Sequence, residues 1–136
     1  MNIGIPRESY PGERRVAMTP AVVPSLTKAG FNVLVETLAG AHAGHSDDEF
    51  IQKGAQILSS RRELFASSQV ILQVLALSAN PPAALADLEL MSPGQVLIGF
   101  LRPLGSAENI LQLARAQITG FAIELLPRIT RAQPMD

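Results

Sequence analysis

The sequence predicts an α/β fold with three layers, in which helices cover both faces of a mostly parallel sheet. Two patterns carry this prediction. Short β-type runs alternate with helix-type segments along the chain, and three of the runs lack polar alternation, as strands covered on both faces do. The length agrees, because 136 residues with 47% hydrophobic content can bury a core without disulfides or metal ions.

Five segments are predicted to be strands, because apolar and β-branched residues dominate them and turn-forming residues flank them. No internal repeat or low-complexity tract interrupts the series, so we expect one continuous domain over residues 1–125. The predicted strands are Asn2–Ile5, Asn32–Val35, Val70–Val74, Gln95–Phe100 and Ile118–Ile123.

Helix start and stop signals lie between these strands. The segments Ser46–Glu49 and Ser60–Glu63 each fit a capping box, in which a hydroxyl and a carboxylate bond reciprocal backbone N–H groups. Gly30 and Gly54 follow where helices must end, because glycine readily adopts the positive φ of that position.

Three further helices follow from the pattern. Pro24 would remove a hydrogen bond from a helix that began at Pro20, so we expect a tight turn over residues 20–23 and a helix over 24–29. Residues 83–90 and 106–116 are predicted helices, the latter with a broad apolar face. This order of elements is typical of a Rossmann/flavodoxin-like domain.

Composition excludes several classes of protein. The chain has 11 basic and 12 acidic residues, scattered along it, and so lacks the basic stripe that nucleic acid needs; we expect no nucleic-acid partner. The absence of cysteine excludes thiol catalysis and thiolate zinc sites. No apolar run approaches the ~20 residues that span a bilayer, and the first residues lack the pattern of a signal peptide.

Two histidines stand in a glycine-rich segment. His42 and His45 lie three residues apart, with Asp47 and Asp48 just after, and such a group could converge on a metal ion. The favoured interpretation is a surface loop that precedes a capped helix. We therefore predict no metal site.

Motifs for tight nucleotide binding or hydrolysis are absent from the sequence. Neither G-x-G-x-x-G nor G-K-[ST] occurs, and there is no serine nucleophile elbow and no H-E-x-x-H. This chain alone is therefore not expected to form a tight dinucleotide site.

Arginines supply the remaining candidates. Arg14 or Arg15, after the first strand, could hold a carboxylate or phosphate bidentately, although an ion pair with Glu8 or Glu13 is the favoured alternative. The final segment, residues 126–136, combines arginines with an amide and a carboxylate, a set that suits a nicotinamide carboxamide and ribose; a solvated tail is the alternative.

Two stretches resemble a known family. Residues 3–8 (IGIPRE) and 11–20 (PGERRVAMTP) resemble the opening of the alanine dehydrogenase and pyridine-nucleotide transhydrogenase family. Residues 126–136 (LPRITRAQPMD) are similar to the nucleotide-contacting loop of the α subunits of proton-translocating NAD(P) transhydrogenases. The similarity extends along essentially the whole chain.

The resemblance implies specific roles and partners. It assigns Arg128, Gln133 and Asp136 to binding NAD(H) and to positioning the nicotinamide for hydride transfer from NADH to NADP⁺, which is coupled to proton translocation. It also implies a companion Rossmann domain that carries the glycine-rich NAD site, and NADP-binding and membrane components. Pro134 replaces the usual serine and is expected to hold Gln133 in extended backbone angles.

Alanine dehydrogenase chemistry is disfavoured residue by residue. The resemblance places a substrate arginine at Arg15, which we retain as a weak anion-binding candidate. The lysine and histidine of that branch fall on Leu75 and Arg102, which cannot supply a lysine cation or a proton-shuttling imidazole.

We therefore predict the N-terminal part of the NAD(H)-binding component of a transhydrogenase, located in the cytoplasm or at the inner membrane through its partners. The 136 residues alone are expected to bind NAD(H) weakly or not at all and to catalyse no reaction. Two alternatives remain: a non-enzymatic interaction module from a truncated copy, which would form a homodimer or join a separate partner, and an alanine dehydrogenase-like fragment.

Overall fold

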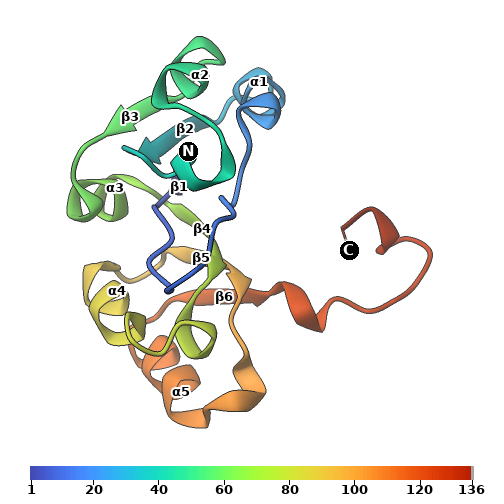
Figure 1. Ribbon diagram of the computed structural model, residues 1–136. Coiled ribbons are helices and arrows are strands. Elements are labelled where there is room, and N and C mark those ends of the chain that lie inside the picture. The colour runs from blue at the N-terminus through green and yellow to red at the C-terminus, as the bar shows by residue number, and fades with distance from the viewer. Residues whose placement is uncertain (136) are drawn as a thin grey trace.

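The computed structural model describes residues 1–135 and contains one six-stranded sheet (Figure 1). The strand order is β3-β2-β1-β4-β5-β6, and all five pairs of neighbouring strands are parallel. This is the doubly wound order of a Rossmann fold, so the predicted fold class is confirmed. The strands are β1 Asn2–Ile5, β2 Asn32–Glu36, β3 Gln56–Leu58, β4 Val70–Leu75, β5 Val96–Phe100 and β6 Thr119–Ala122.

Five α-helices connect the strands. A 3₁₀ turn, Pro20–Val22, precedes the first of them and confirms the tight turn that the two prolines predict. The helices are α1 Val23–Lys28, α2 Asp47–Gln52, α3 Arg61–Ser67, α4 Ala84–Leu90 and α5 Ala107–Arg115.

The predicted helix starts at Ser46 and Ser60 are confirmed, but the complete capping box predicted at Ser60 is wrong. Ser46 and Glu49 form the complete capping box at α2. At α3 the Ser60 hydroxyl oxygen accepts the Glu63 N–H, which is only one of the two bonds of a capping box. Gly30 and Gly54 follow α1 and α2 with φ of 89° and 100°, which glycine adopts without strain.

The strand β3 is the element that the sequence does not reveal. Its three residues are too few to show a period-two pattern, and they follow the helix-ending Gly54 almost at once. Pairing with β2 defines the strand, through the register Leu34 with Gln56 and Val35 with Ile57.

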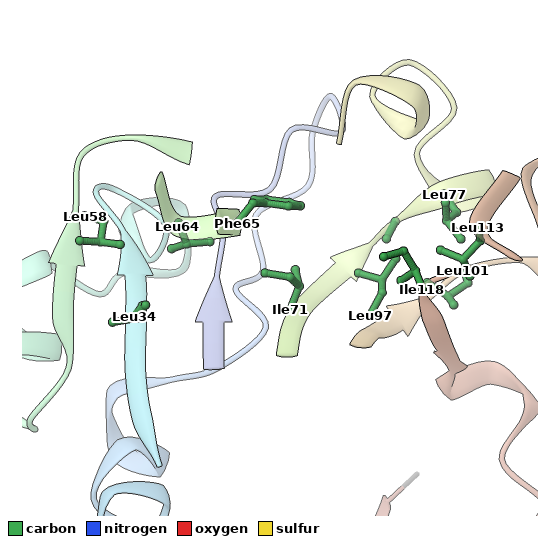
Figure 2. Packing of buried hydrophobic residues seen from close by; sticks show 11 residues of the cluster. Leu34, Leu58, Leu64, Phe65, Ile71, Leu77, Leu97, Leu101, Leu113 and Ile118 are labelled. Carbon is green, nitrogen blue, oxygen red and sulfur yellow. The ribbon is translucent and has the colours of Figure 1, made fainter. Parts of the chain in front are cut away.

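The helices α3, α4 and α5 lie on one face of the sheet, which we call the covered face. Its core runs from Leu34 and Leu58 through Leu64 and Phe65 to Leu113, as Figure 2 shows. Gly4 permits the close approach of α3, because a Cβ there would lie 2.3 Å from the Ser68 Oγ.

The helices α1 and α2 lie on the opposite face and cover β1 to β3. Their core contains Ile5, Val23, Val35 and Phe50, each with no exposed surface. Right-handed crossovers explain this division, because the chain moves one way from β1 to β3 and the other way from β4 to β6.

This arrangement leaves part of the second face without a helix. Leu72, Ile98 and Phe121 are neighbours in register across β4, β5 and β6, and Phe121 remains 56% exposed. We call this surface, which also includes Phe100 and Ile123, the open face. The third layer of the predicted architecture is therefore incomplete over β4 to β6 within residues 1–135.

The helices of residues 1–135 are all too short or too polar to cross a membrane.

Candidate functional site at the carboxyl edge of the sheet

The carboxyl ends of all six strands lie at one edge of the sheet, because every pairing is parallel. Residues 6–18 follow β1, residues 76–83 follow β4, and residues 123–135 follow β6. Ligands of open α/β sheets bind at this edge, especially where the strand order reverses, which here is between β1 and β4. The candidate residues are therefore described from this edge.

Glu8 occupies the point where the strand order reverses. Its carboxylate accepts the N–H groups of Val74 at 2.6 Å and Leu75 at 3.1 Å, at the end of β4. A register shift between Leu72 and Leu75 accompanies these bonds. Burial raises the pKa of Glu8, although the two backbone hydrogen bonds oppose this shift. The Glu8 side chain thus fills the crevice position between β1 and β4, where the strand order reverses.

Arg15 pairs with Glu13 rather than Glu8. Its Nε and Nη2 atoms donate to the two Glu13 oxygens at 2.9 and 2.7 Å, so the predicted ion pair is confirmed for Glu13. The Arg15 hydrogen bond lowers the pKa of Glu13 to about 2. The guanidinium also lies 5.9 Å from the centre of the Phe100 ring.

A cavity of about 420 Å³ adjoins this pair. Arg15 lines it together with apolar residues of β4 and β5, among them Leu72, Ile98 and Phe100. Arg15 is 61% exposed, and its Nη1 atom lies outside the fork that grips Glu13. Binding of an anionic group by Arg15 stays a prediction.

The segment after β6 brings two of the predicted nucleotide-binding residues together. Arg128 and Gln133 are both exposed and line the same cavity of about 140 Å³, with Leu126, Pro127 and Ala132 as its other walls. Ala132 is 5% exposed and forms the packed centre of this segment. Asp136, the third predicted residue, lies outside the described residues.

Gln133 differs from the extended conformation that Pro134 predicts. It begins a 3₁₀ turn, Gln133–Met135. The local bonds run from the Gln133 N–H to Ile129 and from the Met135 N–H to Ala132, at 3.1 and 2.9 Å. They do not use the N–H that Pro134 lacks, so proline is compatible with the turn.

The histidine segment forms a turn ahead of the capped helix α2. His45 Nδ1 lies 3.1 Å from Glu49 Oε2, and the ring stacks edge-on against Phe50. Within residues 1–135, no group of three or more His, Asp or Glu side chains is placed to hold a metal ion.

The two positions at which the resemblance implies a lysine and a histidine lie at the same edge. Leu75 ends β4 with an apolar side chain. Arg102 follows β5 in a left-handed conformation, with φ of 46°. Neither residue supplies the lysine amine or the histidine imidazole that the resemblance implies at these positions.

An ionic network at the first turn of α3 was not predicted from the sequence. Arg61 forms a bidentate pair with Asp87 of α4 at 2.9 and 2.8 Å, and also bonds Glu36 at 2.9 Å and the Arg7 carbonyl at 2.8 Å. Burial lowers the pKa of Arg61, but Asp87 and Glu36 outweigh it and raise the value. The sequence does contain a signal for this network, namely the position of Arg61 in the first turn of a predicted helix. A cation there is unfavourable next to the positive end of the helix dipole and so implies an acidic partner.

Comparison with known proteins identifies similar sequences and structures along almost the whole chain. The family model for the alanine dehydrogenase/PNT N-terminal domain matches residues 4–136. The α subunit of the NAD(P) transhydrogenase of Cereibacter sphaeroides is 39% identical over 137 residues; the alignment covers all of this chain and 25% of that protein.

Two solved structures are similar along the whole fold. The transhydrogenase of Sinorhizobium meliloti superposes with a TM-score of 0.89 and 37% identity, over 100% of this chain and 39% of that one. An L-alanine dehydrogenase superposes with a TM-score of 0.85 and 32% identity, over 98% of this chain and 35% of that one. The chain thus spans between a quarter and two fifths of the lengths of these proteins.

Proposed function

Because the chain belongs to the alanine dehydrogenase/PNT N-terminal domain family, we propose that it forms one side of the NAD(H) site of an NAD(P) transhydrogenase. In the complete protein, hydride would pass from NADH to NADP⁺, coupled to proton translocation. The observation that carries the proposal is the placement of Arg128 and Gln133, exposed and lining one cavity in the segment that leaves the last strand.

The donor set of this segment suits one end of a dinucleotide. Arg128 offers several N–H donors, and the Gln133 amide both donates and accepts, so together they can hold a carboxamide and neighbouring oxygens. Asp136, as a carboxylate, would accept from hydroxyl or amide groups. When bound, NADH supplies the hydride, and the chain's own residues orient the ring that carries it.

The pyrophosphate end of the nucleotide needs another domain. The chain lacks a glycine-rich phosphate loop, and the Glu8 side chain occupies the point between β1 and β4 where the strand order reverses. We therefore propose that residues 1–125 form the structural domain, that residues 126–136 form the nucleotide-contacting loop, and that a companion Rossmann domain holds the phosphates. NADP-binding and membrane components would complete the assembly in the cytoplasm or at the inner membrane.

A second candidate function is an interaction module. The observation that favours it is the open face, with Phe121 56% exposed and a further apolar cavity of about 360 Å³ lined by Ile98, Phe121, Leu126 and Met135. This candidate requires a homodimer or a complex with a separate chain. Light scattering coupled to size exclusion tests the homodimer form of this candidate, because a monomer at all concentrations contradicts self-association.

Nucleotide binding tests the main proposal. Isothermal calorimetry with NADH should give weak or no binding by the 136 residues, and binding should appear when the nucleotide-binding domain of a transhydrogenase α subunit is added. Micromolar affinity of the isolated chain would contradict the first expectation. Hydride transfer to NADP⁺ is then measured after addition of the NADP-binding component.

Matched arginine variants locate the effect. Arg128→Ala should lower NADH affinity in the assembly roughly tenfold to a hundredfold, the usual effect of losing a charge-assisted hydrogen bond. Arg115→Ala removes the same charge from the exposed surface of α5 and should leave affinity unchanged. Equal effects of the two variants would sink the assignment of Arg128.

A further inference from the structure

A polar side chain connects the sheet to the segment that carries Arg128 and Gln133. After β6 the chain makes a 3₁₀ turn, Ile123–Leu125. Within this turn, the Glu124 carboxylate accepts the N–H of Leu101 at 3.3 Å and the N–H of Arg102. One side chain thus links the start of the segment to the end of β5.

The strand ladders of the described residues provide no partner for either N–H group. Pairing of β5 with β6 ends at Gly99 and Ala122, and pairing of β4 with β5 ends at Leu75 and Phe100. The next two residues of the chain, 101 and 102, therefore lie beyond the ladders. A carboxylate that accepts two backbone N–H groups forms charge-assisted bonds, which are stronger than neutral ones.

The remainder of the segment bonds only to itself within residues 1–135. Its backbone bonds join Ile129 to Pro127, Ala132 to Ile129, and Met135 to Ala132, and the Leu126 N–H returns to Ile123. Residues 126–131 are exposed, and the ribbon extends away from the sheet (Figure 1). Apart from apolar contacts, the direction of this segment therefore depends on Glu124.

We propose that Glu124 is a positioning residue, which sets the direction of residues 126–135 and so places Arg128 and Gln133 toward the nucleotide. The structural part of this inference rests on the contacts of Glu124 with Leu101 and Arg102. Its consequence for hydride transfer rests on the proposed function. The two parts are therefore tested separately.

Amide hydrogen exchange by NMR tests the structural part on the 136-residue chain. Glu124→Ala should raise the exchange rates of the Leu101 and Arg102 amides roughly tenfold or more, because each loses its acceptor. The resonances of residues 126–133 should shift as well. Glu124→Gln should restore part of the protection, because one amide oxygen can still accept.

Glu89→Gln is the matched control, since Glu89 is an exposed carboxylate on α4. It should leave these amides and the 126–133 resonances unchanged. If Glu124→Ala does not fold, the comparison of Glu124→Gln with Glu89→Gln decides the matter. Unchanged exchange at Leu101 and Arg102 in both Glu124 variants would overturn the proposal.

Steady-state kinetics test the functional part in the assembly with the companion and NADP-binding components. Glu124→Gln should lower kcat roughly tenfold per folded molecule, because reacting groups are misplaced. It should also raise KM for NADH, but by less than Arg128→Ala does, because the contacts of Arg128 are weakened rather than lost. A fall in folded protein with unchanged kcat would contradict a positioning role. If the wild-type assembly itself binds no NADH, the proposed function fails, whereas the exchange result still decides the structural role of Glu124.

Discussion

The β1–β3 half of the sheet and the β4–β6 half are built from the same alternation of strand and helix, yet they are covered differently. Helices lie on both faces of the first half, whereas the second half has helices on one face. The strand sequences do not explain this, because Leu72, Ile98 and Phe121 are as apolar as the buried residues of β1 and β2. The handedness of the crossovers does, since no helix in residues 1–135 returns over the open face.

This difference gives the two halves of the sheet different roles: burial between layers stabilises the fold, whereas the open face is available for contact with other molecules. The residues with no exposed surface, such as Phe50 and Phe65, lie where two layers meet. The open face, with its exposed Phe121, and the proposed nucleotide-binding segment lie at the other half. Substitutions in the two halves should therefore differ in their effect on unfolding.

The largest effect is expected at the covered face. Phe65→Ala removes a ring with no exposed surface and should lower the free energy of unfolding by about 3–5 kcal/mol, because the cavity cannot fill. Chemical denaturation followed by circular dichroism measures the change. A loss below about 1 kcal/mol would mean that this half is less tightly packed than its burial indicates.

The next effect concerns the ionic network of α3. Arg61→Ala leaves Asp87 and Glu36 without their cation and should cost about 2–3 kcal/mol, since both carboxylates are largely buried. Arg62→Ala, at the exposed neighbouring position, should change stability by less than about 0.5 kcal/mol. Equal losses for the two variants would refute a structural role for the network.

A smaller, pH-dependent effect is expected beside the open face. The pKa of Glu13 is lowered to about 2, so its ion pair with Arg15 stabilises the fold above the ordinary glutamate pKa of 4.5 and loses this effect as pH falls toward 2. Glu13→Gln should therefore cost about 0.5–1 kcal/mol at pH 7 and almost nothing near pH 2.

Glu8 changes the free energy of unfolding with pH in the opposite direction to Glu13. The test of Glu13 is therefore the difference in this free energy between the Glu13→Gln variant and the wild type. Because its pKa is raised, its contribution is present below pH 4.5 and is lost as pH rises through the folded-state value. Denaturation curves of Glu13→Gln and wild type are measured at several pH values. The contribution of Glu8 is present in both proteins and so drops out of the difference. A difference that does not vary with pH would show that the Glu13 carboxylate has no special role.

The smallest effect is expected on the open face. Phe121→Ala removes the same ring as Phe65→Ala, but at a position that is 56% exposed, and should cost about 0.5 kcal/mol or less. Equilibrium denaturation of the two phenylalanine variants side by side gives the sharpest form of the comparison. A loss at Phe121 similar to that at Phe65 would mean that another chain covers this face in solution.

Most of the fold could be predicted because its signals are local. Capping at Ser46 and the helix-ending glycines Gly30 and Gly54 depend on neighbours a few residues away, so composition and spacing reveal them. The strand β3 could not, because three residues carry no period and pairing with β2 defines them. The bare face of β4 to β6 was also unpredicted, since it follows from strand order in space.

The candidate site was predictable only in part. Glu13 lies two residues from Arg15, so their pairing could be anticipated from the sequence. Glu8 reaches Val74, and Glu124 reaches Leu101, across 66 and 23 positions, and no local pattern marks such contacts. The residue types of 126–136 indicate a segment that could hold a nicotinamide, but the individual roles of Arg128 and Gln133 were implied only by the family resemblance.

The strand β6 ends the sheet, and its Thr119, Gly120 and Phe121 are all exposed. Its outward backbone groups offer a template to which a strand of another molecule can add. During refolding, pairing of the exposed β6 edge with another chain competes with folding of the single chain. The yield of native protein should therefore fall as the chain becomes more concentrated. A charged residue in place of Thr119 should relieve the aggregation without disturbing the interior.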